Sequence, residues 1–455
     1  MSINLDIKNI LLEIDESRIK ELRAQFDEFY PQDIAEQIKE LDNEERKKLF
    51  DILSYKQGAE VFAELEESEI IYLFEILSND QIVRFSNEME LDDAADIIGL
   101  LDDQRAIQIL ERIQRPFEIK ELLSYEPYTC GGIMSPHFIS VRDDLKCGAA
   151  LRYLRLKARE DKNEIMYIYV TKKFGELAGV ISLRHLFKAD DDAPVSEHMM
   201  DEVIAVNVDE DQEIAAELIS KYNFYALPVV NEVKQLSGII TVDDIVDVIE
   251  DEATEDIYQS SGINVDRETD LNANRLDWRS FLGAYKARTP WIVITLCGQC
   301  LAALLIAQYD TTIAAAPIAF SFMPLLSGMS GNIGNQSTTI VVRGMSLGEI
   351  DTDDTVKIFS HELLISLGIG LTCAFLTGGL AWFLYHNALL AILIAASLVL
   401  SMAIAVGFGS ITPLVFKGLD IDPAIASGPL ITTAIDMISF FVYLALVTRF
   451  VTALV

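Results

Sequence analysis

Long apolar segments after residue 285 restrict the fold of this chain more than any other feature. A bilayer's hydrocarbon core is about 30 Å thick, and a helix needs about 20 apolar residues to cross it. Five segments meet this requirement, at 290–309, about 313–342, about 363–385, 388–416 and 424–448. The sequence therefore predicts a helical membrane domain with five spans, which we place at 285–455.

The fifth segment carries a charge where a membrane helix rarely tolerates one. Asp436 is the single charged residue between 424 and 448. It is about 12 residues from either end, or about 18 Å at 1.5 Å per residue, so its carboxylate cannot reach the bilayer surface. A carboxylate at such a depth costs on the order of 3 kcal/mol on insertion scales, and residues of this kind usually mark a functional site.

Charge divides the chain into two regions. The total is −35, and the nine acidic and six basic residues after position 285 leave −32 for the preceding part. So acidic a surface disfavours nucleic acid and anionic lipid as partners, and it suits a protein that meets cations. The amino terminus also lacks the apolar core of a cleavable signal.

The basic residues of the membrane domain predict its orientation. If the acidic region is cytoplasmic, Arg449 is outside, and five basic residues fall on the cytoplasmic side, as the positive-inside rule requires. These five are Lys286, Arg288, Arg343, Lys357 and Lys417. The sequence thus predicts a multi-pass protein of the cell (inner) membrane, with its carboxyl terminus outside.

Residues 1–130 have the pattern of an acidic helical domain. Apolar residues recur at three- and four-residue steps, between breaks of Asp, Asn and Ser that suit helix caps. Recurrent short amphipathic helices predict a superhelical stack. Such a domain is at least as well suited to be a scaffold for protein interactions as to carry chemistry.

An internal repeat follows this domain. Residues 168–187 resemble residues 228–247, with Gly179 aligned to Gly238 and Ser182 to Thr241. Each copy predicts two strands and then a helix that begins at Ser or Thr. The pattern resembles a tandem pair of CBS domains, at 131–195 and 196–253.

The CBS resemblance implies a nucleotide site. In that family, a Ser/Thr-x-x-Asp step can hold the ribose of an adenine nucleotide. The second copy has this step in Thr241 and Asp244, whereas the first copy has Ser182 and His185. An adenine nucleotide such as ATP is therefore expected at the second copy.

An acidic stripe follows the repeat. Asp244, Asp247, Asp251 and Glu255 step by three, four and four residues along one helical face, beside Glu252 and Asp256. The stripe is either a solvated surface or part of a cation-dependent joint, since divalent cations bind carboxylate oxygens. The pairs Asp92–Asp96 and Asp211–Glu213 are available to face it. A connecting, plug-like helix is predicted at 254–284.

The second apolar segment contains the polar stretch "PLLSGMSGNIGNQS". Its glycines, at 328, 331 and 334, favour close helix packing. Asn332, Asn335 and Gln336 are polar at membrane depth, which is tolerated mainly beside a water-filled path. Broken helices near the midplane are common at ion sites, so a break in this span is also expected.

The order of these regions resembles the MgtE family of magnesium channels and transporters. The resemblance rests on "PLLSGMSGNIGNQS", "DPAIASGPLITTAID", "YEPYTCGGIM" and "DEATEDI". It implies a homodimer with a pore on the two-fold axis, lined by the second and fifth spans and by Asp436 of each subunit. Mg²⁺ sheds its water reluctantly, so Asn332 and the backbone near Gly328 and Pro429 would add uncharged oxygens around a hydrated ion.

The resemblance also implies closure by cytosolic Mg²⁺ bound at acidic domain interfaces. Some members have an acid where this chain has Asn223, which puts one cation site in doubt. The positions that match regulatory ligands are Asp92, Asp96, Asp211, Glu213, Asp244, Asp247, Glu252, Glu255, Asp256 and Asp422.

These features predict a multi-domain, dimeric Mg²⁺ channel or transporter whose partners are Mg²⁺ and membrane lipid. Mg²⁺ and an adenine nucleotide are its expected ligands. Two alternatives remain: a carrier of Mn²⁺ or Co²⁺, and a membrane-anchored nucleotide or cation sensor that transports nothing. An enzyme is not expected, because no set of nucleophile, base and orienting group appears.

Overall fold

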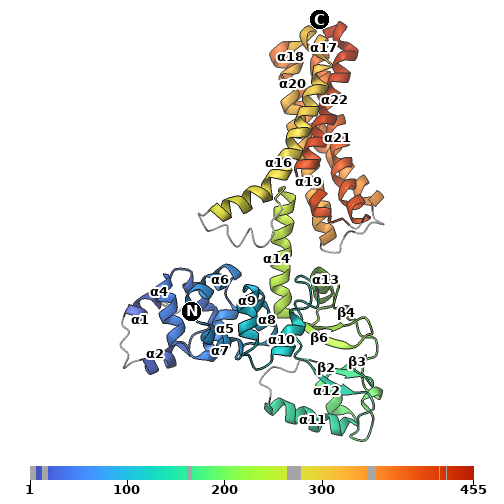
Figure 1. The fold of residues 1–455 in the computed structure, drawn as a ribbon. Coiled ribbons are helices and arrows are strands. Elements are labelled where there is room, and N and C mark those ends of the chain that lie inside the picture. The colour runs from blue at the N-terminus through green and yellow to red at the C-terminus, as the bar shows by residue number, and fades with distance from the viewer. Residues whose placement is uncertain are drawn as a thin grey trace. The chain divides into compact units, whose positions relative to one another are not determined.

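A computed structural model describes most of the chain as two compact units, Met1–Glu250 and Asp251–Val455. We treat each unit by itself (Figure 1). The described residues are 7–12, 19–160, 167–263, 278–346, 350, 355–419, 421–426 and 428–454.

The amino-terminal region is built of short helices in which alternate members pack together. Helix α3 contacts α5, α5 contacts α7 and α7 contacts α9, while α4 contacts α6 and α8 contacts α10. This arrangement is that of a helical stack, and the helical prediction for the region is confirmed. The helices are α1 (Ile7–Leu12), α2 (Ile19–Phe26), α3 (Pro31–Ile38), α4 (Asn43–Ile52), α5 (Tyr55–Ala63), α6 (Glu67–Ile76), α7 (Asn79–Ser86), α8 (Leu91–Gly99), α9 (Asp103–Leu110) and α10 (Pro116–Leu122).

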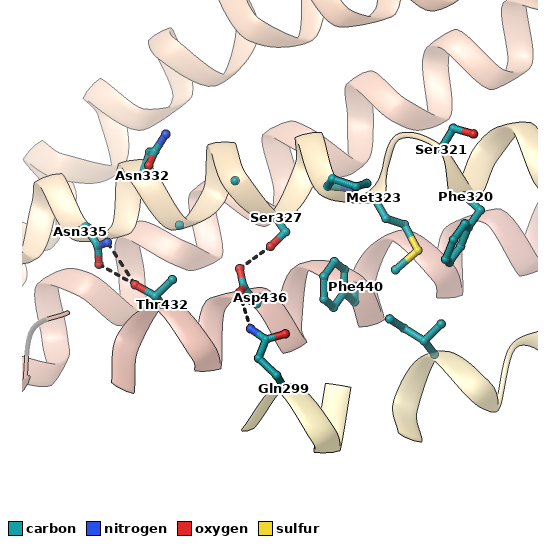
Figure 2. Close-up of a pocket in the computed structure, with 14 residues that line it drawn as sticks. Gln299, Phe320, Ser321, Met323, Ser327, Asn332, Asn335, Thr432, Asp436 and Phe440 are labelled. Carbon is teal, nitrogen blue, oxygen red and sulfur yellow. Dashed lines mark hydrogen bonds between the residues drawn. The ribbon is translucent and has the colours of Figure 1, made fainter. Parts of the chain in front are cut away.

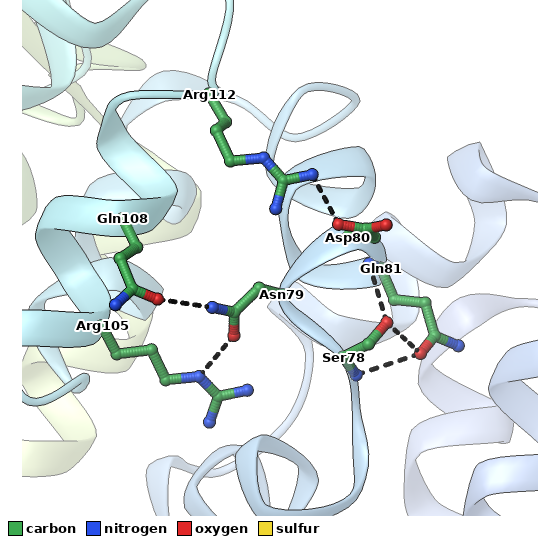
Figure 3. A network of polar contacts seen from close by, with 7 residues as sticks. All are labelled: Ser78, Asn79, Asp80, Gln81, Arg105, Gln108 and Arg112. Carbon is green, nitrogen blue, oxygen red and sulfur yellow. Dashed lines mark hydrogen bonds and ion pairs between the residues drawn. The ribbon is translucent and has the colours of Figure 1, made fainter.

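Contacts between polar side chains join neighbouring helices of this stack (Figure 3). Arg105 on α9 donates to the carbonyl oxygens of Phe74 and Leu77 at 2.6 and 3.0 Å, and to Asn79 Oδ1 at 2.8 Å. The last carbonyls of a helix have no partner within it. Arg105 therefore satisfies the end of α6 and joins it to α7 and α9, while Arg112 forms an ion pair with Asp80.

The internal repeat forms two three-stranded sheets with the same topology. In each sheet the first strand pairs parallel with the second, and the second pairs antiparallel with the third. Gly179 lies opposite Val170 and Gly238 opposite Val229, so both copies keep one register. The strands are β1 (Ile139–Arg142), β2 (Ile168–Thr171), β3 (Leu177–Ile181), β4 (Val206–Asn207), β5 (Ala226–Val230) and β6 (Leu236–Thr241), with helices α11 (Cys147–Glu160), α12 (Leu183–Lys188) and α13 (Gln212–Tyr222).

The aligned glycines have a steric reason. A Cβ at Gly179 would be 2.6 Å from the Met200 carbonyl oxygen, and a Cβ at Gly238 would be 2.8 Å from that of Ser135. Both contacts belong to short backbone pairings that cover the outer edge of a sheet. Glycine in a strand often marks such a close approach of another backbone.

The helix after the second copy is α14 (Val242–Ser260), which carries the predicted acidic stripe on a single helix. It ends within the range 254–284, where a connecting helix was predicted. The next helix, α16, begins at Trp278, seven residues before the predicted membrane domain, and residues 264–277 lie outside the described part. Thr241 ends β6 and leads directly into α14.

Among the described residues of the second unit, four helices are long and apolar enough to cross a membrane. They include Phe281–Ala307 of α16 (Trp278–Ala307), Val356–Tyr385 of α20 (Thr355–Tyr385), α21 (Ala388–Lys417), and Pro429–Phe450 of α22 (Pro429–Leu454). The predicted second span instead comprises α17 (Asp310–Ala315), α18 (Pro317–Phe320) and α19 (Met323–Ser346). Its predicted start at about 313 was wrong, because the chain turns at Ser321 and Phe322 before α19 begins.

Helix α19 is continuous through its glycines, so the expected break within the polar stretch was wrong. A Cβ at Gly334 would be 2.2 Å from Ile435, and a Cβ at Gly409 would be 2.4 Å from the Gly334 carbonyl oxygen. Small residues let α19 approach α21 and α22 closely, as is usual for helices in membranes. The packing explanation therefore holds at Gly334.

Candidate functional site

A cavity of about 770 Å³ lies in the second unit beside Asp436. Residues of α16, α18, α19 and α22 line it, together with Ser321 in the turn before α19. Figure 2 shows Asn332 and Asn335 on one side of Asp436, and Met323, Phe320 and Phe440 on the other. The cavity thus has a polar part and an apolar part, with the carboxylate between them.

The Asp436 carboxylate is held by side chains from two other helices. Gln299 Nε2 on α16 donates to Oδ2 at 3.1 Å, and Ser327 Oγ on α19 donates to Oδ1. The carboxylate is partly exposed and lines the cavity. Since an ionised carboxylate accepts about four hydrogen bonds, two donors leave room for the waters of a hydrated cation.

The uncharged groups predicted around Asp436 differ in their placement. Asn332 lines the cavity and is exposed, and Gly328 lines it with nothing within 4 Å of where a Cβ would be. Asn335 also lines the cavity, and its Nδ2 donates to Thr432 Oγ1 at 3.1 Å, which joins α19 to α22. Pro429 lies outside the cavity lining, where its carbonyl oxygen accepts from Thr433 Oγ1.

The position of Asp436 along its helix also differs somewhat from the prediction. The apolar span of α22 begins at Pro429, five residues later than predicted, and ends at Phe450. Asp436 is therefore three to four residues from the middle of that span, or about 5 Å at 1.5 Å per residue. A carboxylate at that position remains too deep to reach either end of the helix easily.

In the first unit, α8 and the start of α14 bring several carboxylates together. Burial and the nearby charges of Asp92, Glu90 and Asp244 raise the pKa of Asp93 to about 7. Burial raises the pKa of Asp244 to about 6, and Asp92 adds to this effect. Asp92 Oδ1 is buried and has no hydrogen-bond partner in the part of the chain that the structure describes. The ionised forms of these groups repel one another, so a cation or a proton would relieve the repulsion.

This cluster makes the stability of the first unit depend on pH. A carboxyl whose pKa rises on folding binds more protons when folded, so its contribution to stability is lost as pH rises from about 4 to about 7. In divalent-free buffer, the wild-type free energy of unfolding should thus fall with pH by up to about 1.4 kcal/mol per unit relative to Asp93→Asn. Calorimetry of both proteins at pH 5, 6 and 7 measures this difference. Equal pH slopes would contradict the assignment to Asp93.

The predicted nucleotide residues lie together at the start of α14. Thr241 Oγ1 donates to Asp244 Oδ2 at 2.5 Å, and the Thr241 backbone N–H donates to the same oxygen at 3.3 Å. In the first copy, Ser182 Oγ accepts instead from the His185 backbone N–H at 3.2 Å. The two copies therefore share a cap position but present different groups, and a carboxylate is available at the second copy.

Two further predicted ligands, Asp256 and Asp422, lie in the second unit. Burial raises the pKa of Asp256, and the charge of Asp422 adds to the shift. Ser346 Oγ donates to Asp256 Oδ2 at 3.1 Å, which opposes the shift, as does Arg343. The charge of Asp422, before α22, therefore acts on Asp256 near the end of α14.

Other predicted ligands have local partners. Asp211 caps α13 by accepting from the Glu213 backbone N–H at 2.9 Å, and both side chains are exposed. Burial raises the pKa of Glu64, and the charge of Asp247 adds to this shift. Glu255 accepts from Gln259 at 2.6 Å, and Glu252 lies partly buried on α14. Within the described ranges, no three His, Cys, Asp or Glu side chains form a group that could hold a metal ion.

Sequence reasoning missed several residues of these sites. Gln299 and Ser327 contact Asp436 across 137 and 109 residues of sequence, and neither belongs to a local motif. The polarity of Gln299 within an apolar segment was a signal that could have found it. Asp93 and Glu90 are acidic neighbours of the predicted Asp92 in the sequence. The spacing of acidic residues that singled out Asp92 could also have identified them.

Comparisons with known proteins give one consistent result. Residues 323–446 match the family described as "MgtE: Divalent cation transporter". Residues 29–128 match the MgtE intracellular N domain, and 130–192 and 195–251 match CBS domains. These matches cover the helical stack from α3 onward, the two sheets, and helices α19 and α22 beside the cavity.

Relatives match over almost the whole chain. The protein named Magnesium transporter MgtE of Thermus thermophilus is 35% identical over 95% of both chains, and that of Bacillus subtilis is 30% identical over 98% of both. The solved cytosolic domain of the Mg²⁺ channel MgtE in complex with ATP is 34% identical, covers 53% of this chain and 98% of its own, and has a TM-score of 0.50. The chain therefore belongs to the MgtE family.

Proposed function

We propose that this protein transports Mg²⁺ across a membrane by way of Asp436. The observation that carries the proposal is the Asp436 carboxylate, which lines a cavity between apolar helices long enough to span a bilayer. Relatives at 30 and 35% identity are named as magnesium transporters, and transport is not an enzymatic function. Since carboxylate and amide oxygens suit Mg²⁺, the polar side of the cavity fits this ion.

We also propose that the transporter is a homodimer with its pore on the two-fold axis. The cavity is partly open in a single chain, so a second copy would complete its wall with a second Asp436. Helix α19 has 24 residues and contacts α21 and α22, which supports its role as a fifth span although it is less apolar than the other four. The acidic unit would lie in the cytoplasm, with the carboxyl terminus outside.

Hydration decides how the cavity would hold the ion. Mg²⁺ keeps several of its waters, and these waters donate hydrogen bonds to the oxygens around them. Asp436 and Asn332 present such oxygens to a cavity of about 770 Å³, which is large enough for a hydrated ion.

Closure by cytosolic Mg²⁺ is the regulatory part of the proposal. Two sets of carboxylates support it: those of α8 and the start of α14, and Asp256 with Asp422. Within each set, the ionised carboxylates repel one another when no cation is bound. Mg²⁺ bound there would hold α14 in one position. The arrangement agrees with the strong excess of negative charge before residue 286.

The direct test is ion uptake by the purified protein in liposomes. We expect Mg²⁺ to enter faster than in protein-free liposomes, and to enter in preference to Mn²⁺ and Co²⁺. Faster entry of Mn²⁺ or Co²⁺ would make the protein a carrier of another divalent cation. No entry of any divalent cation would leave the nucleotide or cation sensor as the explanation.

Nucleotide binding gives a separate prediction. The ATP complex of the related cytosolic domain supports an adenine nucleotide at Thr241 and Asp244 of this chain. Since a hydrogen bond to a charged group contributes about 1.5–3 kcal/mol, Asp244→Ala should weaken ATP binding about tenfold or more. Ser182→Ala, at the same position of the first copy, is the matched control. Calorimetry that finds equal affinity in both variants would contradict a site at the second copy.

A further inference from the structure

Gln299 is a polar residue on an apolar helix that the transport chemistry does not by itself require. It lies on α16, within the apolar stretch Phe281–Ala307, and its side chain is exposed along the cavity. Its Nε2 donates to Asp436 Oδ2 at 3.1 Å. In Figure 2, Gln299 and Ser327 approach the carboxylate from opposite sides.

Two fixed donors restrict where the carboxylate can point. A free aspartate side chain has several rotamers, and its terminal torsion is broad. With Ser327 bonded to Oδ1 and Gln299 to Oδ2, the plane of the carboxylate is set by helices α19 and α16 together. The remaining acceptor positions of both oxygens are left for water, and so for a hydrated cation.

An amide suits this position better than the other donors. A Lys or Arg would bond the carboxylate and also cancel its charge, whereas Gln donates a hydrogen bond and leaves the full charge for the cation. A Glu would repel Asp436. The residue type therefore fits a carboxylate that must be oriented without being neutralised.

We propose that Gln299 is a positioning residue that orients Asp436 toward the hydrated cation and so helps to set its affinity; this inference rests on the proposed function of Asp436. Gln299 acts through the carboxylate, and its effect should vanish when the carboxylate is gone. Helix α16 thereby becomes part of the cation site even though its other cavity-lining residue, Ile306, is apolar.

The test uses Gln299→Met, which keeps the length of the side chain and removes the donor. Gln308→Met is the matched control, because Gln308 follows the same helix and lines a different, apolar hollow with Leu301 and Phe441. Each full-length variant is recorded as a Na⁺ current in divalent-free solution, and Mg²⁺ is then added until the current is half blocked. Half-block reports the affinity of the cation site.

We expect Gln299→Met to raise the half-blocking Mg²⁺ concentration about tenfold, equivalent to about 1.4 kcal/mol, and Gln308→Met to leave it within about twofold. In an Asp436→Asn background, Gln299→Met should add no further change. An equal effect with and without Asp436 would overturn the inference, because Gln299 would then act independently of the carboxylate.

The results also distinguish a failure of the role of Gln299 from a failure of the proposed function of Asp436. If Asp436→Asn blocks like the wild type, the proposed function of Asp436 fails. If Asp436→Asn loses the block while Gln299→Met behaves like Gln308→Met, only the role of Gln299 fails. Should Gln299→Met not fold, Ser327→Ala removes the other donor and is expected to weaken the block in the same way.

Discussion

Replacing Asp436 by Asn is expected to abolish selective Mg²⁺ transport while leaving the protein folded. Asn nearly preserves the shape of the side chain and can still accept from one of its two donors, Gln299 and Ser327. The charge, however, is lost. At 5 Å and an effective dielectric constant of 20, each pair of unit charges contributes about 3 kcal/mol, which corresponds to more than 100-fold in affinity.

The effect of Asp436→Asn should exceed that of any other neutralisation in the membrane domain. Asp310 is a suitable control, because it begins α17, is exposed and lies outside the cavity lining. Asp310→Asn should transport Mg²⁺ at the wild-type rate in liposomes. Ordinary Mg²⁺ uptake by a well-folded Asp436→Asn protein would refute the assignment of Asp436 as the pore carboxylate.

Residues that act locally were predictable from the sequence. Gly179 and Gly238 aligned at a common offset, and the structure gives both the same strand register. Asp436 stood out because a charge in an apolar run has few structural explanations. Thr241 and Asp244 are three residues apart, and a helix start brings such a pair into contact.

Contacts between distant helices were not predictable in the same way. The stretch around Gly331 was expected to break its helix, since broken helices near the midplane are common at ion sites. The helix is continuous instead, and it packs against α22, where Gly334 fits beside Ile435 and a larger residue would not. Likewise, no periodicity in α16 relates Gln299 to a carboxylate 137 residues later.

The regulatory ligands were predictable only in part. Asp92 was predicted to be available to face the stripe that begins at Asp244, and burial together with the charge of Asp92 raises the pKa of Asp244. Asp211 was predicted on the same grounds, yet it serves as a helix cap. Acid spacing identifies which carboxylates can share a face, but only the tertiary structure shows which of them meet.

The acidic stripe of α14 leads to the second large effect. Neutralising Asp247, Glu252 and Glu255 together, by Asp247→Asn, Glu252→Gln and Glu255→Gln, should leave a transporter that stays active at high cytosolic Mg²⁺. The region before residue 286 carries −32 per chain, so −64 in a dimer, and these acids repel without cations. Mg²⁺ would bridge them and hold the closed state.

The free energy needed to close the protein is larger than one cation site can supply, so several cation sites must act together. Moving an equilibrium from nearly open to nearly closed takes about 5.5 kcal/mol of differential binding, whereas one exposed ion pair contributes at most about 1 kcal/mol. Single neutralisations should therefore shift the inhibitory Mg²⁺ concentration only modestly. The triple variant should shift it beyond the range tested.

A matched triple neutralisation separates site from net charge. Asp201→Asn, Glu202→Gln and Glu232→Gln remove the same charge from exposed positions away from α14. Patch recordings across a cytosolic Mg²⁺ titration should show closure in this control and none in the α14 triple variant. Closure without Mg²⁺ in the α14 variant would mean that self-repulsion keeps the protein open. An unchanged titration would mean that the stripe is only a solvated face, since three carboxylates cannot be lost from a working cation joint without weakening its affinity.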